Sequence, residues 1–198
     1  MNNSESAFSI VEELTKVAQK SIFDSEYSTE NLISNSLLLA QYAQYKDTDC
    51  SDSLQVAIER LYCDKSANDS FWNGNAGKLA LYTYLYKKNI LSANDFVFLR
   101  NGIESLKSSS LQMLTEGNLD FLYGAVGIAH SLRSNYSEKD RYYFDFFFKS
   151  VTDLIDTSVS RMIEAYDLKE KKIISGEVHI GIAHGILSIL KLCIDCLR

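Results

Sequence analysis

Two histidines lie five residues apart in the segment "VHIGIAHGILS", which covers residues 178–188. The sequence contains only three histidines, and His184 stands in a Gly-Ile-Ala-His-Gly frame. Histidine is the side chain that most readily gives and takes protons near neutral pH. The small neighbours clear space around its ring, so His184 could serve as a general acid. A structural role, in which His184 caps or fills a helical repeat, is the alternative.

A carboxylate precedes a second glycine motif, "NLDFLYGAVGI", where Asp120 lies four residues before Gly124. A carboxylate beside an imidazole can hold the ring and favour its charged form. The amino end of a helix disfavours an imidazolium, so Asp120 would have to offset that bias. The competing interpretation makes Asp120 an N-cap or first-turn carboxylate before Gly124.

The other histidines and the paired cysteines do not predict a metal or redox site. His179 is five residues from His184, whereas residues on one helix face are three or four apart. His130 falls inside an apolar helical segment and is predicted to be a core or groove histidine. Cys193 and Cys196 form a Cys-x-x-Cys pair, but no second pair or thioredoxin-like strand accompanies it, so buried thiols are predicted.

A repeated pattern surrounds these residues. Segments 73–85, 123–133 and 184–194 each show a glycine, two residues, a small residue and an apolar run. A weaker copy, 33–45, keeps Ser36 but has lost the glycines. Such spacing is typical of repeated helical hairpins. A glycine at a helix start allows close backbone approach or leaves amides open to a ligand. The predicted starts of inner helices are Gly74, Gly124 and Gly185.

Between the glycine segments, apolar residues recur at helical spacing beside charged faces, which is typical of an outer helical layer. Capping-box patterns run from Ser92 to Asp95 and from Ser137 to Asp140. The chain contains no proline, which permits long helices. The fold class is therefore predicted to be all-α, with helical hairpins wound as a solenoid or an α/α toroid. The predicted outer helices are roughly 6–22, 50–64, 94–116 and 139–167.

Composition limits the remaining possibilities. A chain of 198 residues with 46% apolar and 23% charged residues is predicted to form a single globular domain, 1–198. Its net charge of −6 argues against a nucleic-acid partner. The N-terminus does not resemble a signal peptide, and no apolar stretch approaches the ~20 residues of a membrane span. We therefore expect a cytoplasmic protein that is not transmembrane, with its four cysteines reduced.

The segments "FWNGNAGKLALYTYL", "NLDFLYGAVGI" and "IGIAHGILSIL" resemble the repeat motifs of the lanthionine synthetase cyclase (lanthionine synthetase C-like) family. The resemblance covers most of the chain from about residue 30 onward. It implies a toroid of seven inner and seven outer helices around a zinc site. It also implies the family's reaction, in which cysteine thiols of a precursor peptide add to dehydroalanine or dehydrobutyrine and form thioether rings.

Two site residues follow from the resemblance. His184 matches the histidine of the family's Gly-Leu-Ala-His-Gly motif, and Asp120 matches the aspartate before its earlier Gly-x-x-Gly motif. In the family's chemistry a thiolate attacks the alkene and the resulting enolate is protonated, a step that suits His184. Ser188 departs from the family pattern, which usually has glycine there, and predicts slightly looser helix packing.

The resemblance also predicts what this chain lacks. The family's zinc is held by two cysteines and a histidine well downstream of the Gly-Ala-His-Gly motif, whereas this sequence ends at Arg198. Zinc is therefore expected for the complete family enzyme and not in this chain. About four of the seven hairpins are expected, which makes an incomplete, truncated barrel that is inactive by itself.

The expected partners are the precursor peptide or the missing C-terminal half, and a dehydratase. Uncovered inner-helix faces predict a homo-oligomer or dependence on a partner. One alternative is a non-catalytic half-toroid that binds a peptide or a partner enzyme. Another is a different α/α toroid enzyme, which would need paired carboxylates or an Asp-rich metal motif, and the sequence shows neither.

Overall fold

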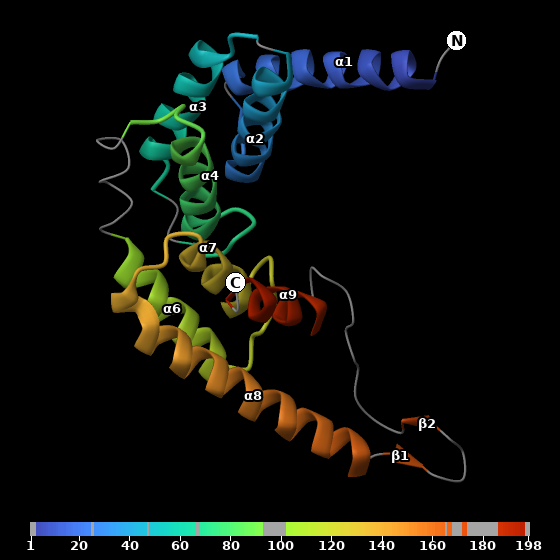
Figure 1. Ribbon diagram of the computed structural model, residues 1–198, viewed down its shortest axis with the longest axis vertical. Helices are drawn as coiled ribbons and strands as arrows, with labels where there is room; N and C mark the ends of the chain where they lie inside the picture. Colours follow the sequence, from blue (N-terminus) through green and yellow to red (C-terminus); the bar gives the residue numbers. More distant parts are fainter. Residues whose placement is uncertain are drawn as a thin grey trace. The chain divides into compact units, whose positions relative to one another are not determined.

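A computed structural model describes residues 3–24, 26–46, 48–65, 68–92, 102–164, 166–167, 172–173 and 186–196 (Figure 1). The regular secondary structure in these ranges is helical except for one antiparallel pair of two-residue strands, β1 (Tyr166–Asp167) and β2 (Lys172–Ile173). The predicted all-α class is confirmed. The chain divides into two compact units, residues 1–101 and 102–198, and each is described by itself. The predicted single domain and the number of hairpins stay predictions.

Unit 1 contains two helical pairs. The first pair is α1 (Asn3–Phe23) with α2 (Thr29–Lys46), and the second is α3 (Ser51–Cys63) with α4 (Asn75–Lys87). Helix α2 packs against α1, α3 and α4, and α1 also contacts α3. Helix α2 contacts all three other helices and most residues of α4 are buried, so these two are the inner helices, and α1 and α3 are the outer ones. Their shared core is aliphatic and includes Ile22, Leu32, Leu39, Leu54, Leu61, Leu81 and Leu85.

Unit 2 repeats this arrangement with α6 (Ile103–Thr115), α7 (Ala125–Arg133), α8 (Arg141–Glu164) and α9 (Ile186–Cys196). A short 3-10 helix, η1 (Glu138–Asp140), leads into α8. Inner helix α7 packs against α6 and α9, and α6 contacts α8. The residues of α7 from Ala125 to Ala129 are all buried, as expected for a helix covered on most sides.

Two of the three predicted inner-helix starts lie in the described residues, and both are confirmed. Gly74 is the N-cap of α4 and Gly124 is the N-cap of α7. Gly185 directly precedes Ile186, the first residue of α9, but itself lies outside the described residues.

The predicted outer helices agree with α1, α3 and the segment from η1 through α8. Residues 93–101 are not described, so the Ser92–Asp95 capping box lies outside the described residues and α6 is the described part of that outer helix. The second capping box is confirmed, because Asp140 Oδ2 accepts hydrogen bonds from the Ser137 N–H at 2.8 Å and from Ser137 Oγ at 2.7 Å. Among the described helices, none combines the length and hydropathy of a membrane span.

Candidate functional site

The loop of residues 118–124 folds over the amino end of α7 and holds Asp120 there. Asn118 Oδ1 accepts the N–H of Asp120 at 3.1 Å, and Asp120 Oδ1 accepts the N–H of Tyr123 at 2.7 Å. The Ala125 N–H donates to the carbonyl oxygen of Asn118 at 3.1 Å, which ties the start of the loop to the first turn of α7. Side chains of Asn and Asp favour such turns because they bond nearby backbone groups. Asp120 is therefore fixed, half-buried, at the mouth of an inner helix.

Gly124 allows this loop to close. A Cβ at this position would lie 2.3 Å from Asn118 Oδ1 and 2.6 Å from the Asp120 nitrogen. Its backbone is extended, with φ −126° and ψ −167°, so any residue could adopt the conformation. Glycine is needed for the close approach of the loop rather than for an unusual dihedral angle.

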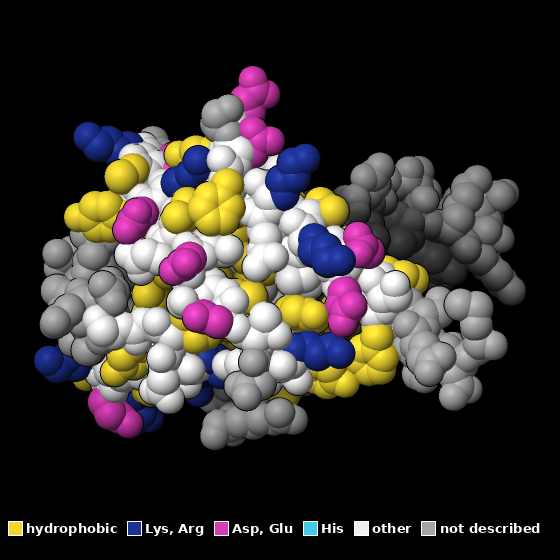
Figure 2. Space-filling view, turned by 90° about the horizontal axis from the view of Figure 1, so that it is seen from above, with side chains coloured by type: hydrophobic (Ala, Val, Ile, Leu, Met, Phe, Trp, Pro, Cys, Tyr) yellow, Lys and Arg dark blue, Asp and Glu magenta, His cyan; other side chains and the backbone are white. Residues whose placement is uncertain are grey.

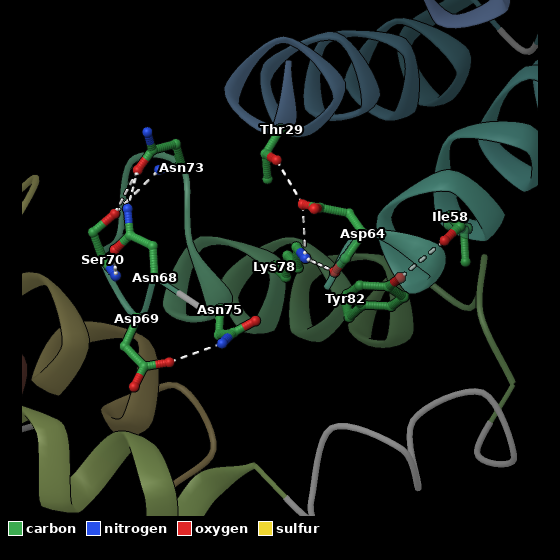
Figure 3. A network of polar contacts seen from close by, with 10 residues as sticks. All are labelled: Thr29, Ile58, Asp64, Asn68, Asp69, Ser70, Asn73, Asn75, Lys78 and Tyr82. Carbon is green, nitrogen blue, oxygen red and sulfur yellow. Dashed lines mark hydrogen bonds and ion pairs between the residues drawn. The ribbon is translucent and has the colours of Figure 1, made fainter. Parts of the chain in front are cut away.

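The loop before α4 has the same construction (Figure 3). Asn68 Oδ1 accepts the Ser70 N–H at 2.8 Å, and Ser70 Oγ accepts the Asn73 N–H at 3.4 Å. The N–H of Asn75 donates to the Asn68 carbonyl oxygen at 2.9 Å. A Cβ on Gly74 would lie 2.3 Å from that same carbonyl oxygen. The two loops therefore have the same local structure, although one belongs to unit 1 and the other to unit 2.

Asp120 occupies in unit 2 the place that Ser70 occupies in unit 1. Each side chain accepts the N–H of the residue three positions further along the chain. Because Gly124 is the N-cap of α7, the interpretation of Asp120 as an N-cap or first-turn residue is wrong. The carboxylate stabilises the preceding loop, and its negative charge is favourable near a helix amino end.

In the two described repeats, the residue directly before the motif glycine lies at a helix mouth. In the aligned repeats this residue is Asn73, Tyr123 or His184. The Tyr123 side chain is 46% exposed, whereas Ala125 just beyond the glycine is fully buried. Asn73 is half-buried. In both described repeats this position therefore carries a partly or fully solvent-accessible side chain beside a helix amino end. His184 lies outside the described residues, as do Gly181 and His179.

The second glycine of the motif also marks a close contact in unit 1. A Cβ on Gly77 would lie 2.3 Å from the carbonyl oxygen of Phe71 and 3.1 Å from Ile33 Cδ1. In α9 the corresponding residue is Ser188, which is buried at 1% exposure. Looser packing at Ser188 stays a prediction.

His130 lies near the carboxyl end of α7 and is half-buried. Its ring contacts the ring of Phe121, with the ring centroids 5.5 Å apart. Phe121 belongs to the same loop as Asp120, so His130 supports that loop from the helix side. This position agrees with the prediction of a core or groove histidine.

The described cysteines lie on separate parts of the chain. Cys50 is buried at the start of α3, Cys63 is exposed at its end, and Cys193 is half-buried in α9. Burial raises the pKa of the Cys50 and Cys193 thiols, which keeps both neutral near neutral pH. Within the ranges that the structure describes, no three His, Cys, Asp or Glu side chains converge as metal ligands. The described residues therefore do not fit the zinc ion that the resemblance implies.

A buried ion pair in unit 1 was not predicted from the sequence. Lys78, only 4% exposed, places Nζ 3.0 Å from Asp64 Oδ2 and donates to the Asp64 carbonyl oxygen at 2.7 Å (Figure 3). Thr29 Oγ1 donates to the same carboxylate at 2.6 Å. The cluster joins the start of α2, the end of α3 and the first turn of α4. A buried charge needs such partners, so this cluster is a structural clamp.

Comparison with protein families matches residues 32–198 to the family described as lanthionine synthetase C-like protein. No curated protein and no solved structure gives a significant match. The matched region contains both loop–helix units, Asp120 and the segment around His184. Because the match spans well over half of the sequence, the chain belongs to the lanthionine synthetase C-like protein family.

Proposed function

We propose that this chain forms part of a thioether-forming cyclase that acts on a dehydrated precursor peptide. In this reaction the sulfur of a peptide cysteine bonds to the β-carbon of dehydroalanine or dehydrobutyrine. The alkene electrons shift toward the carbonyl oxygen and give an enolate. A proton then adds to the α-carbon, which balances the proton that the thiol loses. Family membership supports the reaction class.

We assign the proton donor of the last step to His184. The observation that carries this assignment is the exposure of Tyr123, which stands directly before Gly124 as His184 stands directly before Gly185. A side chain in this position can meet a ligand, whereas those just beyond the glycine are packed in the core. A histidine is suited to the step because its pKa lies near neutral pH.

We assign to Asp120 the task of holding the imidazole and favouring its protonated form. Two observations support this role. Asp120 is fixed at the mouth of α7 by its hydrogen bond to the Tyr123 N–H. Helix α7 packs against α9, whose first residue lies two positions after His184. A nearby carboxylate raises the pKa of an imidazole and offsets the unfavourable helix dipole.

We further propose that the chain reacts only when other residues complete the site. The described side chains do not form a metal site, and the cysteines with raised pKa values are poor metal ligands without further help. No step assigned to this chain passes through zinc. The experiment therefore combines the chain with the C-terminal half of a lanthionine synthetase C-like protein.

The test measures loss of free thiol in a dehydrated precursor peptide, because cyclisation leaves the peptide mass unchanged. His184→Ala should lower the rate by roughly 10²–10⁴-fold, the usual range for a lost general acid. His179→Ala is the matched control and should leave the rate unchanged. Equal rates for wild type and His184→Ala would refute the assignment, and binding without thiol loss in any mixture would favour a non-catalytic peptide-binding half-toroid.

A second pair of variants separates the structural and catalytic roles of Asp120. Asp120→Ser installs the residue that unit 1 uses, so the hydrogen bond to the Tyr123 N–H and the thermal midpoint should be retained. The cyclisation rate should nevertheless fall, because the charge is lost. Ser70→Asp is the control and should change neither quantity. If Asp120→Ser cyclises as fast as wild type, the carboxylate has only its structural role.

A further inference from the structure

Helix α1 carries an apolar stripe that the rest of unit 1 does not cover. Ile10, Leu14 and Val17 follow one another at spacings of four and three residues, which places them on one side of the helix. Their side chains are 58%, 52% and 64% exposed. Figure 2 views the side on which α1 lies in Figure 1 and shows hydrophobic side chains at the surface among charged ones. Apolar residues grouped in this way indicate an interaction surface.

A different side of the same helix already packs on unit 1. Thr15, Ala18 and Ile22 are buried, and α1 contacts both α2 and α3. A helix that serves only as an outer layer needs one apolar side. The stripe is therefore additional to the side that the fold uses. The stripe also lies before residue 32, where the match to the lanthionine synthetase C-like family begins.

The charges beside the stripe are arranged for self-association. With Leu14 at heptad position a, Ile10 and Val17 are at d, and Glu13 and Lys20 are both at g. If two copies of α1 pair antiparallel with Leu14 opposite Val17, each Glu13 lies beside Lys20 of the second copy. Because the dimer has a two-fold axis, this pair of opposite charges occurs twice in it. Both side chains are exposed in the single chain and can reach across. Glu13 Oε1 also lies 2.8 Å from Lys16 Nζ, but this ion pair is itself exposed and leaves Glu13 accessible to a second copy.

We propose that the stripe of Ile10, Leu14 and Val17 is the contact surface between two copies of this chain, with the α1 helices antiparallel about a two-fold axis. A lipid surface fits less well. Helices that lie on membranes carry an excess of Lys and Arg on their polar side. Over residues 8–23 of α1, where side-chain exposure is described, the exposed polar side has balanced charge, contributed by Glu12, Glu13, Lys16 and Lys20.

Sedimentation velocity of the 198-residue chain over a range of concentrations tests the proposal. Wild type should show a reversible equilibrium between monomer and dimer. Leu14→Glu should remove the dimer, and because the side chain is half exposed, circular dichroism should show an unchanged fold. A wild type that remains monomeric at every concentration would overturn the proposal, as would a dimer that survives Leu14→Glu.

Charge reversal tests the antiparallel register. Glu13→Lys or Lys20→Glu alone should weaken the dimer by ~10-fold, because each change replaces two attractive contacts by two repulsive ones. The double variant Glu13→Lys/Lys20→Glu should restore the wild-type dissociation constant. Lys65→Glu makes the same change of charge at an exposed position outside α1 and should have little effect. A double variant no better than the single ones would refute this register and the stripe as the self-contact.

Discussion

The loop–helix segment of unit 1, residues 68–87, and that of unit 2, residues 118–133, share their backbone contacts but differ in key side chains. In both, an asparagine begins the loop and a glycine ends it, and a Cβ on that glycine would crowd an oxygen of the asparagine and the backbone nitrogen two residues after it. The position between them holds Ser70 in one copy and Asp120 in the other. The comparison separates residues that build the loop from residues that a function can change.

The two segments also differ one residue beyond the second glycine. Unit 1 has Lys78, which is buried and paired with Asp64, and unit 2 has Ile128, which is fully buried. Unit 2 places its own partly buried lysine elsewhere, because Lys107 of α6 lies 2.6 Å from Asp140 Oδ1 at the start of α8. Each unit thus uses a lysine to link two of its elements, but the lysine comes from a different helix in each.

The largest effect is expected from the glycines that both copies share. Gly124→Ala and Gly74→Ala should each lower the free energy of unfolding by ~3 kcal/mol, because the added Cβ meets backbone atoms that cannot move without opening the loop. Urea unfolding followed by circular dichroism measures the change. Gly117→Ala is the control: its φ is +74° and its Cβ would meet nothing within 4 Å, so strain alone should cost ~1 kcal/mol. Equal losses at all three positions would show that crowding is unimportant.

The two motif glycines illustrate how much of the fold could be predicted from the sequence alone. Gly74 and Gly124 were predicted as helix starts, since their spacing from a small residue and an apolar run recurs along the chain. Asn68 and Asn118 were missed, although each lies six residues before a motif glycine. Their role is visible only when the loop is folded, because the side chain bonds a backbone group two residues away.

The contacts between distant residues could not be predicted from the sequence for another reason. Thr29 and Asp64 are 35 residues apart, and Asp64 and Lys78 are 14 apart, so no local pattern links them. From the sequence alone, a lysine in an apolar inner helix is expected to be exposed to solvent, because the elements that pack around it are not known. The family resemblance supplied His184 and Asp120 as site residues, and their catalytic roles remain predictions because His184 lies outside the described residues.

A medium effect is expected when unit 1 is given the residue type of unit 2 at its clamp. Lys78→Met should lower the free energy of unfolding by ~2 kcal/mol, because Asp64 loses its charged partner while its side chain stays mostly covered. The double variant Lys78→Met/Asp64→Asn should recover part of this loss, since it removes the uncompensated carboxylate. Urea unfolding of wild type, Lys78→Met, Asp64→Asn and the double variant gives the coupling between the two sites. Additive losses would mean that the ion pair contributes nothing.

The smallest effect concerns the pair in unit 2 and its dependence on pH. Burial acts to raise the pKa of Asp140, but hydrogen bonds from Lys107 and Ser137 outweigh it and hold the pKa below 3.8. A carboxyl with a lowered pKa adds stability above its unfolded pKa, and this stability is lost as the pH falls through the folded value. Asp140→Asn should therefore cost ~1 kcal/mol at pH ~7.

The difference between Asp140→Asn and wild type should shrink as the pH is lowered below 3.8, where the wild-type carboxyl also becomes neutral. Urea unfolding at several pH values measures it. Asp145→Asn is the control, because this carboxylate is exposed and its ion pair is long, with Asp145 Oδ2 3.8 Å from Arg141 Nε. A constant difference between wild type and Asp140→Asn at all pH values would show that the charge of Asp140 does not stabilise the start of α8.

The self-contained loops have a consequence for the order of folding. Their hydrogen bonds join residues only two to seven positions apart, as from Asn118 to Asp120 and to Ala125. Contacts of such low sequence separation form quickly, because little chain entropy is lost in closing them. Each loop can therefore close before its helix finds neighbours, and the clamp from Thr29 to Asp64 must form later. Nascent chains would then acquire correctly started inner helices one at a time, in the order of synthesis.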